Sequence, residues 1–236
     1  MSDDKIVIHI PAREGSKRVP HKNLRYLAGQ PLITYSIDAA RGANLTDEIY
    51  VNTDSEVLLK LAESYKIKGY KRSKELASDA ATSDQFNMDI INNLNPITLI
   101  MVNPVCPLIT AEDITNAYKI FKEQKVDTLI TANSTQMQSF YKGKAINFNI
   151  DEHLAPTQNN APVSICNWAV SIWDAESFRQ RYEKDGNAVF GSKLYLMDID
   201  HTKSVKVSNE DDFVYAEKIM QAMQLPASND KQYWSE

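Results

Sequence analysis

The stretch Ile6-Val7-Ile8-His9-Ile10 decides the fold class, because it is a continuous β-rich apolar run that ends at Pro11. Such a run is typical of a strand buried on both faces of a parallel sheet. A polar, basic loop follows, and from Pro31 onward the apolar residues recur three and four positions apart, as they do in a helix. The first unit of the chain is therefore predicted to be strand, loop and helix.

The same alternation of strand and helix patterns continues along the chain. Further strands are predicted at 48–52, 96–102 and 128–132, and helices at 57–65, after Ser83 and at 111–124, with Ser55 as the N-cap of the helix at 57–65. Repeated βα units imply right-handed crossovers. We therefore predict an α/β fold, a three-layer αβα arrangement around a mostly parallel sheet.

The rhythm changes after Ser134. Residues 144–149 alternate like an antiparallel strand and 164–172 are again strand-like, so 135–175 are interpreted as a β insertion. Late strands at 194–197 and 204–207 and a closing helix at 210–223 complete the prediction. We expect one domain over 1–225 and a loose C-terminal tail over 226–236.

Size and composition limit the classes of protein to consider. The 236 residues suffice for one large core, and the two cysteines, Cys106 and Cys166, lack the spacing of a zinc or disulfide framework. The net charge of -5 argues against a general nucleic-acid binder. No apolar run approaches the roughly 18 residues of a membrane span, and the acidic start is unlike a signal peptide. A cytoplasmic protein without membrane or nucleic-acid partners is expected.

The loop after the first strand carries the strongest chemical signal. It contains Arg13, Lys17, Arg18 and Lys22, with Gly15 among them. Loops at the carboxyl ends of parallel strands form the usual ligand crevice, glycine permits close backbone approach, and arginine and lysine donate to phosphate oxygens. The loop is neither a Walker A nor a GxGxxG sequence. From the pattern alone, phosphate binding and a merely solvated basic loop both remain open.

The longer stretch from Ile10 to Asn23 resembles the opening motif of the CMP-acidic-sugar synthetases, also called acylneuraminate cytidylyltransferases. Further segments in the family's order strengthen the resemblance, which covers the chain well to about Ala132. They are Gly29–Ser36, Val51–Ser55, and Arg72 with Leu76–Asp79. Beyond them, Asp211–Phe213 resembles the start of the family's last helix.

The resemblance implies a Rossmann-like fold and an enzyme, a nucleotidyltransferase. Such an enzyme transfers CMP from CTP to a 2-keto-3-deoxy acidic sugar of the sialic, legionaminic, pseudaminic or octulosonic type, and releases pyrophosphate. It also implies Mg²⁺ as cofactor and a homodimer in which the β insertion reaches the neighbouring subunit.

The resemblance further assigns roles to individual residues. Arg13, Lys17 and Lys22 are expected to hold the triphosphate and to act in catalysis. The expected nucleotide-binding residues are Ala12, Gly15, Ser16, Asn23, Asp54, Arg72, Ala77 and Thr82, and the expected sugar-binding residues are Asn103, Gln158 and Asn167. For the segment from Leu76 to Thr82, a simple capped loop before the next helix is the alternative.

The sequence departs from the family at the metal position. The family carries Asp-x-Asp before its last helix, where this chain has Lys206 and Ser208. Neither residue is a hard anionic oxygen ligand suited to Mg²⁺. The candidate replacements are Asp198 and Asp200, for which a solvated turn is the alternative, and Asp211 and Asp212, for which helix N-terminal acids are the alternative.

Two other departures concern the acceptor side. The segment after Asn103 lacks the family's hydroxyls and arginine, and its Cys106 is expected to be a buried thiol rather than a nucleophile. Thr157 stands where the family places an arginine for the sugar carboxylate, and Trp168 replaces a glycine. Another nucleotide or a sugar phosphate, or an inactive nucleotide-binding paralogue, therefore remains as an alternative.

Overall fold

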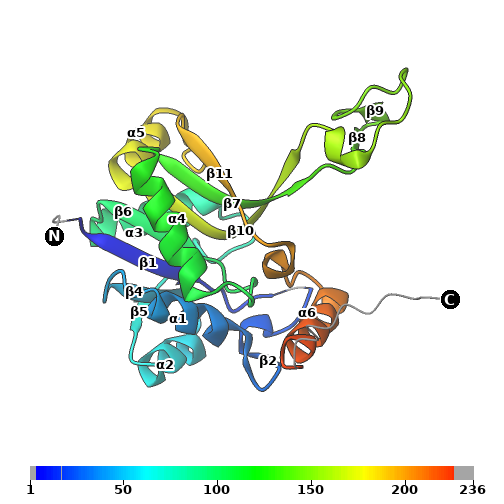
Figure 1. Ribbon diagram of the computed structural model, residues 1–236. Helices are drawn as coiled ribbons and strands as arrows, with labels where there is room; N and C mark the ends of the chain where they lie inside the picture. Colours follow the sequence, from blue (N-terminus) through cyan, green and yellow to red (C-terminus); the bar gives the residue numbers. More distant parts are fainter. Residues whose placement is uncertain (1–3, 17, 226–236) are drawn as a thin grey trace.

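The computed structural model describes residues 4–16 and 18–225. Its centre is a seven-stranded sheet with strand order β11-β7-β10-β6-β1-β4-β5 (Figure 1). The strands are β1 (Ile6–Pro11), β4 (Ile49–Thr53), β5 (Lys68–Lys71), β6 (Thr98–Val102), β7 (Thr128–Thr135), β10 (Val163–Asp174) and β11 (Leu194–Asp198). Only β10 runs against its neighbours, β6 and β7. The predicted α/β fold with a mostly parallel sheet is confirmed.

Helices cover both faces of this sheet. They are α1 (Leu32–Gly42), α2 (Glu56–Ser64), α3 (Ser83–Leu94), α4 (Ala111–Glu123), α5 (Ala175–Asp185) and α6 (Glu210–Met223). Ile8 and Ile10 of β1 belong to the core beneath α1, α2 and α4, whereas Val7 belongs to the core beneath α3 and α5. Because side chains alternate across a strand, the apolar run of β1 fills both cores.

The last helix packs against the start of the chain. Phe213 and Ala216 of α6 form a separate small core with Val19 and Leu27, beside the short elements η1 (Lys22–Leu24), β2 (Tyr26–Leu27) and β3 (Gln30–Pro31). Val207 is fully buried in the same cluster. This packing brings the two ends of the sequence together around the first loop.

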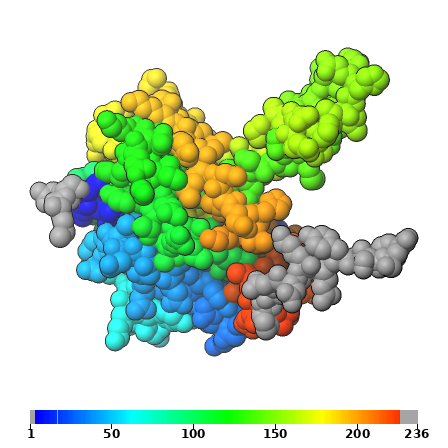
Figure 2. Space-filling view, viewed as in Figure 1, coloured from blue at the N-terminus to red at the C-terminus, as the bar shows by residue number. Residues whose placement is uncertain are grey.

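Residues 136–162 leave the sheet as a projecting arm, which stands clear of the body in both views (Figures 1 and 2). At its tip, β8 (Phe140–Tyr141) and β9 (Lys144–Ala145) pair around a turn in which Lys142 and Gly143 both have positive φ. The predicted strand over 144–149 is wrong beyond Ala145. The buried Asn147 side chain bonds the backbone of Ser139, Met137 and Ala161, and so turns the chain there.

Other boundaries also differ from the sequence-based expectation. The stretch 204–207 is not a strand, because Ser204 ends the short helix η3 (His201–Ser204). The alternating valines of this stretch reflect the burial of Val207 under α6. Ser55 occupies the N-cap position of α2 without a side-chain capping bond. The sequence analysis did not identify β5 or α5. The expected tail, 226–236, lies outside the described residues.

Candidate functional site

Two adjoining cavities lie where the strands β1, β5 and β6 end. The first, of about 460 Å³, is lined by Pro11, Arg13, Gly15, Ser16, Arg18, Lys22, Asn23, Asn103, Pro104 and Val105. The second, of about 330 Å³, is lined by Pro11, Arg13, Arg72, Ser83, Phe86, Met101, Asn103, Trp168, Trp173, Val189 and Lys206. Pro11, Arg13 and Asn103 border both, so we treat the two as one cleft. Its place at the carboxyl ends of parallel strands is the usual one for a ligand site in this fold class.

The first loop is fixed by contacts with the end of β4 and with the loops that follow β4 and β5. The Ala12 amide donates to the carbonyl of Asn52 at 2.9 Å, and the Glu14 amide donates to a carboxylate oxygen of Asp54 at 2.9 Å. The Arg13 guanidinium forms an ion pair with Asp79 at 2.7 Å, although its side chain remains 38% exposed. Arg13 therefore lines the cleft while neighbouring loops set its position.

Lys22 joins the first loop to the segment before α6. Its Nζ donates to the carbonyl of Val207 at 2.9 Å. Burial, followed by the nearby charges of Arg18 and Lys206, lowers the pKa of Lys22 below its ordinary value. Three cationic side chains therefore share one small region, and a bound polyanion would relieve their mutual repulsion.

Arg72 forms the buried floor of the second cavity. Only 5% of the residue is exposed, its Nε donates to Asn52 Oδ1 at 2.8 Å, and its Nη2 donates to the Asn52 carbonyl at 2.9 Å. The guanidinium lies over the Phe86 ring, 4.6 Å from its centroid. Burial lowers its pKa to about 10, so it stays charged at neutral pH. An arginine held this rigidly suits recognition of a planar or anionic group.

Trp168 closes the aromatic side of the same cavity from an unusual backbone conformation. Its φ is 63°, and it lies in the part of β10 where the pairing with β7 shifts between Cys166 and Ser171. The indole contacts Phe190 edge to face, with ring centroids 5.3 Å apart. A bulky residue with positive φ is a true outlier, and such outliers concentrate at functional sites.

The remaining residues predicted to bind nucleotide lie at various depths around the cleft. Gly15 and Ser16 line the first cavity, as does Asn23, which is buried. Ala77 and Thr82 do not line either cavity: the Ala77 amide donates to the Ser73 carbonyl, and Thr82 forms the capping box of α3. Asp54 acts on the loop through the Glu14 amide, as described above. Lys17 lies outside the described residues.

The three residues predicted to bind sugar are separated. Asn103 borders both cavities. Asn167 is buried and bonds Thr131 and Asn133, so it supports the bulge that presents Trp168. Gln158 is exposed on the arm, within η2 (Thr157–Asn159), and its carbonyl accepts from Gln136. The structure of one chain thus brings only Asn103 into the cleft.

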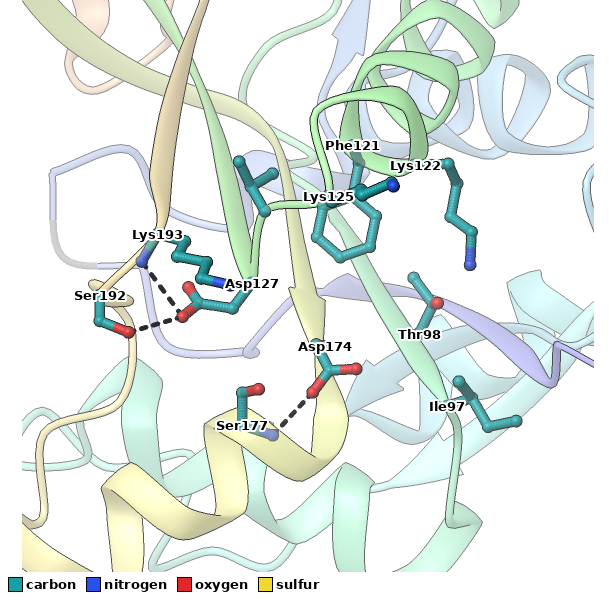
Figure 3. Close-up of a pocket in the computed structure, with 11 residues that line it drawn as sticks. Ile97, Thr98, Phe121, Lys122, Lys125, Asp127, Asp174, Ser177, Ser192 and Lys193 are labelled. Atoms are coloured by element: carbon teal, nitrogen blue, oxygen red, sulfur yellow. Dashed lines mark hydrogen bonds between the residues drawn. The ribbon is translucent and has the colours of Figure 1, made fainter.

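A larger cavity, of about 570 Å³, lies at the opposite end of the strands, where β6, β7 and β11 begin. Figure 3 shows its carboxylates already engaged: Asp127 accepts from Ser192 and from the Lys193 amide, and Asp174 caps α5 through the Ser177 amide. One oxygen of each carboxylate is thus bound to structural donors. The cleft at the strand carboxyl ends remains the candidate site.

Comparison with known families agrees with this geometry. A family profile described as Cytidylyltransferase matches residues 6–154, which include the first loop and most of the strands that border the cleft. The chain belongs to the cytidylyltransferase family. The resemblance found in the sequence is thereby confirmed.

The chain is similar to cytidylyltransferases named for different acidic sugars. The chain is 27% identical over 220 residues to an N-acylneuraminate cytidylyltransferase of Streptococcus agalactiae, covering 89% of this chain and 52% of that protein. It is 32% identical over 141 residues to a pseudaminic acid cytidylyltransferase of Campylobacter jejuni, covering 56% of this chain and 61% of that one. The chain therefore spans about half the length of the streptococcal relative.

A solved structure supports the Rossmann-like fold of this cytidylyltransferase. A CMP:2-keto-3-deoxy-manno-octonic acid synthetase, solved in complex with CTP, superposes with a TM-score of 0.66 at 14% identity, covering 93% of this chain and 99% of that chain. None of the described helices has the length and apolar character needed to cross a bilayer.

The carboxylates considered for Mg²⁺ do not fit a metal site. Asp198 accepts from the Ser134 amide at 2.7 Å, Asp200 caps η3, and Asp212 accepts from the Ser208 and Asn209 amides. Within residues 4–16 and 18–225, no cluster of three potential ligands among His, Cys, Asp and Glu was found. Each acid has a structural hydrogen-bonding role instead: Asp198 links the end of β11 to β7, and Asp200 and Asp212 accept from backbone amides at helix starts.

Several cleft residues were not predicted from the sequence. Phe86 and Trp173 line the second cavity, yet both read as ordinary core aromatics. Arg18 was noted as part of the basic loop but was not assigned to the site. Cys106 was correctly expected to be a buried thiol: burial raises its pKa to about 12.

Proposed function

We propose that this chain transfers CMP from CTP to a 2-keto-3-deoxy acidic sugar, with release of pyrophosphate. The acceptor class is that of the sialic, legionaminic, pseudaminic and octulosonic acids, which the names of the relatives support. The proposal assigns the triphosphate to the first cavity and the cytidine and sugar to the aromatic side of the cleft.

One observation carries the proposal: the cleft is lined by cations. Arg13, Arg18, Lys22, Arg72 and Lys206 border it, and its lining contains no aspartate or glutamate among the described residues. Transfer of a phosphoryl-type group depends on positioning and on stabilising spread negative charge, which such donors provide. Lys17 belongs to the same basic loop and is retained in the proposal on sequence grounds.

Within this proposal, the residues have separate tasks. Arg13 and Lys22 hold the triphosphate, with Gly15 and Ser16 allowing the backbone to approach it. Arg72 and the loop carrying Ala77 and Thr82 flank the cytidine. Such positioning lowers the barrier by holding the reacting atoms in line.

On the acceptor side, Asn103 and Trp168 border the space left for the sugar. Asn167 holds the bulge that carries Trp168, and Gln158 on the arm is assigned to the acceptor site of a neighbouring subunit. The sugar carboxylate would form an ion pair with a cation of the cleft, or with Lys142 or Lys144 of a partner's arm.

Exposed apolar side chains on the arm favour a homodimer as the functional assembly. They include Phe140, which is 54% exposed, Ile150 at 64% and Leu154 at 74%. A surface of this kind marks an interaction site when it is contiguous. Consumption of CTP agrees with the cytoplasmic location expected from the sequence.

The test is a thermal-shift screen of CTP, UTP, GTP and ATP, with and without Mg²⁺. CTP is expected to raise the melting temperature most, because a ligand that binds only the native state stabilises it. Arg13→Ala should abolish the response, whereas Arg179→Ala should keep it, since Arg179 pairs with Glu176 on α5 away from the cleft. An unchanged response in Arg13→Ala would remove the basis for the assignment.

The same screen separates the alternatives. A larger shift with GTP or UTP would redirect the nucleotide assignment. A CTP shift without release of pyrophosphate from CTP in the presence of any of the acids would favour an inactive nucleotide-binding paralogue. The residues Lys206 and Ser208 at the family's metal positions make this a specific alternative.

A further inference from the structure

The backbone next to Lys206 is hydrogen-bonded to two residues that line the cleft. The Val207 amide donates to the Val105 carbonyl at 2.8 Å, and the Val207 carbonyl accepts from Lys22 at 2.9 Å. The Val207 side chain is fully buried with Val19 and Phe213. The segment is therefore anchored immediately after Lys206.

The Lys206 side chain itself is exposed and lines the second cavity together with Arg13 and Arg72. Its charge also acts on groups at the first cavity: it contributes to the lowered pKa of Lys22 and counteracts the raised pKa of Cys106. Lys206 thus lies between the two parts of the cleft, where a ligand extending through both would pass.

A protein that holds Mg²⁺ beside substrate phosphates usually does so through one or two carboxylates, and the lining of the cleft offers none among the described residues. The nearest candidates by sequence, Asp198, Asp200 and Asp212, hold backbone amides. A lysine ammonium group, by contrast, delivers a compact positive charge with three donors and needs no carboxylates to hold it.

We propose that Lys206 supplies, to the phosphates of the bound nucleotide, the positive charge that a protein-held divalent cation would otherwise provide, so that nucleotide binding by this chain does not require Mg²⁺. The inference rests on the proposed function, because it takes a nucleoside triphosphate as the ligand of the cleft. It makes Lys206 a binding residue in its own right.

The experiment is calorimetric titration of the full chain with CTP, once in EDTA and once in excess Mg²⁺. Wild type is expected to bind in EDTA with a dissociation constant within about threefold of that in Mg²⁺, a difference well under the tenfold that corresponds to about 1.4 kcal/mol. Lys206→Ala should weaken binding in EDTA by about tenfold or more, the loss expected for one charge-assisted bond.

Two further variants sharpen the test. Lys206→Asp, which adds a hard oxygen ligand, should bind poorly in EDTA and recover in Mg²⁺. Lys193→Ala removes a cation that lines the cavity at the opposite end of the strands and should bind like wild type in both buffers. Far-UV circular dichroism and the melting temperature of each variant verify that it is folded.

Wild-type binding that needs Mg²⁺, or a Lys206→Ala variant that matches Lys193→Ala in EDTA, would overturn the inference while leaving the proposed function intact. Failure of wild type to bind CTP in either buffer would instead reject the proposed function, and the inference with it.

Discussion

The Nζ of Lys22 donates to the carbonyl of Val207 at 2.9 Å, which joins a loop near the start of the chain to the segment just before its last helix. The two residues are separated by 185 positions in the sequence. This bond closes one side of the cationic cleft, and the Phe213 core behind it holds α6 in place. The cleft is therefore a tertiary feature that depends on the C-terminal part of the chain.

Replacing Lys22 by methionine should weaken CTP binding while preserving the fold. Methionine keeps most of the apolar stem, and removal of a half-buried charge offsets part of the lost bond to Val207. The dissociation constant should rise about tenfold, the effect of one charge-assisted bond. Calorimetry measures it, with Lys125→Met at the opposite cavity as the control; equal affinities for the two variants would contradict the assignment.

Asp212 should prove to be a helix cap rather than a metal ligand. Asp212→Ala removes the acceptor for the Ser208 and Asn209 amides and should cost about 1 kcal/mol of unfolding free energy. Its exposed neighbour is the matched control: Asp211→Ala should cost less than about 0.5 kcal/mol. Urea denaturation measures both. A stabilisation of wild type by Mg²⁺ alone that disappears in Asp212→Ala would identify a metal ligand instead.

Trp168 should show the reverse of the usual order between alanine and glycine. Both Trp168→Ala and Trp168→Gly remove the indole, but only glycine adopts a φ of 63° without strain. The glycine variant should therefore be more stable by about 1 kcal/mol. Comparison of the two midpoints of denaturation checks this. If the alanine variant were the more stable, the backbone at Trp168 would not be strained in solution.

His9 should make stability depend on pH. Burial, followed by the charge of Arg72, lowers the pKa of His9 from 6.5 to about 3. Between these values the unfolded chain binds a proton that the native chain does not, so stability falls as the pH drops below 6.5, by about 1.4 kcal/mol per pH unit. Above pH 6.5 this contribution is constant.

The comparison of variants isolates that effect. His9→Leu should lack the added slope between pH 6.5 and 4, whereas His153→Leu, a change at an exposed histidine of the arm, should keep it. Denaturation midpoints across this range provide the measurement. Parallel curves for wild type and His9→Leu would show that His9 does not titrate as the buried geometry requires.

The sequence predicted the layers of the fold because most strands and helices of the core carry their own periodicity. The run from Ile6 to Ile10 is buried on both faces, and its apolar pattern says so directly. The arm was harder to predict: the alternation over 144–149 resembles a strand, yet one buried side chain, Asn147, redirects the backbone. Nothing local in the sequence distinguishes these two outcomes.

The candidate site, like the fold, was predicted only in part from the sequence. The first loop was found from its charge and position, since Arg13 and Lys22 follow a buried strand. Phe86 and the positive φ of Trp168 were not found, because they acquire their roles from Arg72 and from the bulge in β10. Contacts of that kind are set by tertiary packing, and sequence patterns report only local preference.

The central claim is most directly tested by pyrophosphate release. The chain is incubated with CTP and, in turn, a sialic, a legionaminic, a pseudaminic and an octulosonic acid, each with and without Mg²⁺. The account predicts release that requires both CTP and one of these acids and that is lost in Arg13→Ala. No release with any acid, or release supported by another nucleotide in place of CTP, would contradict it.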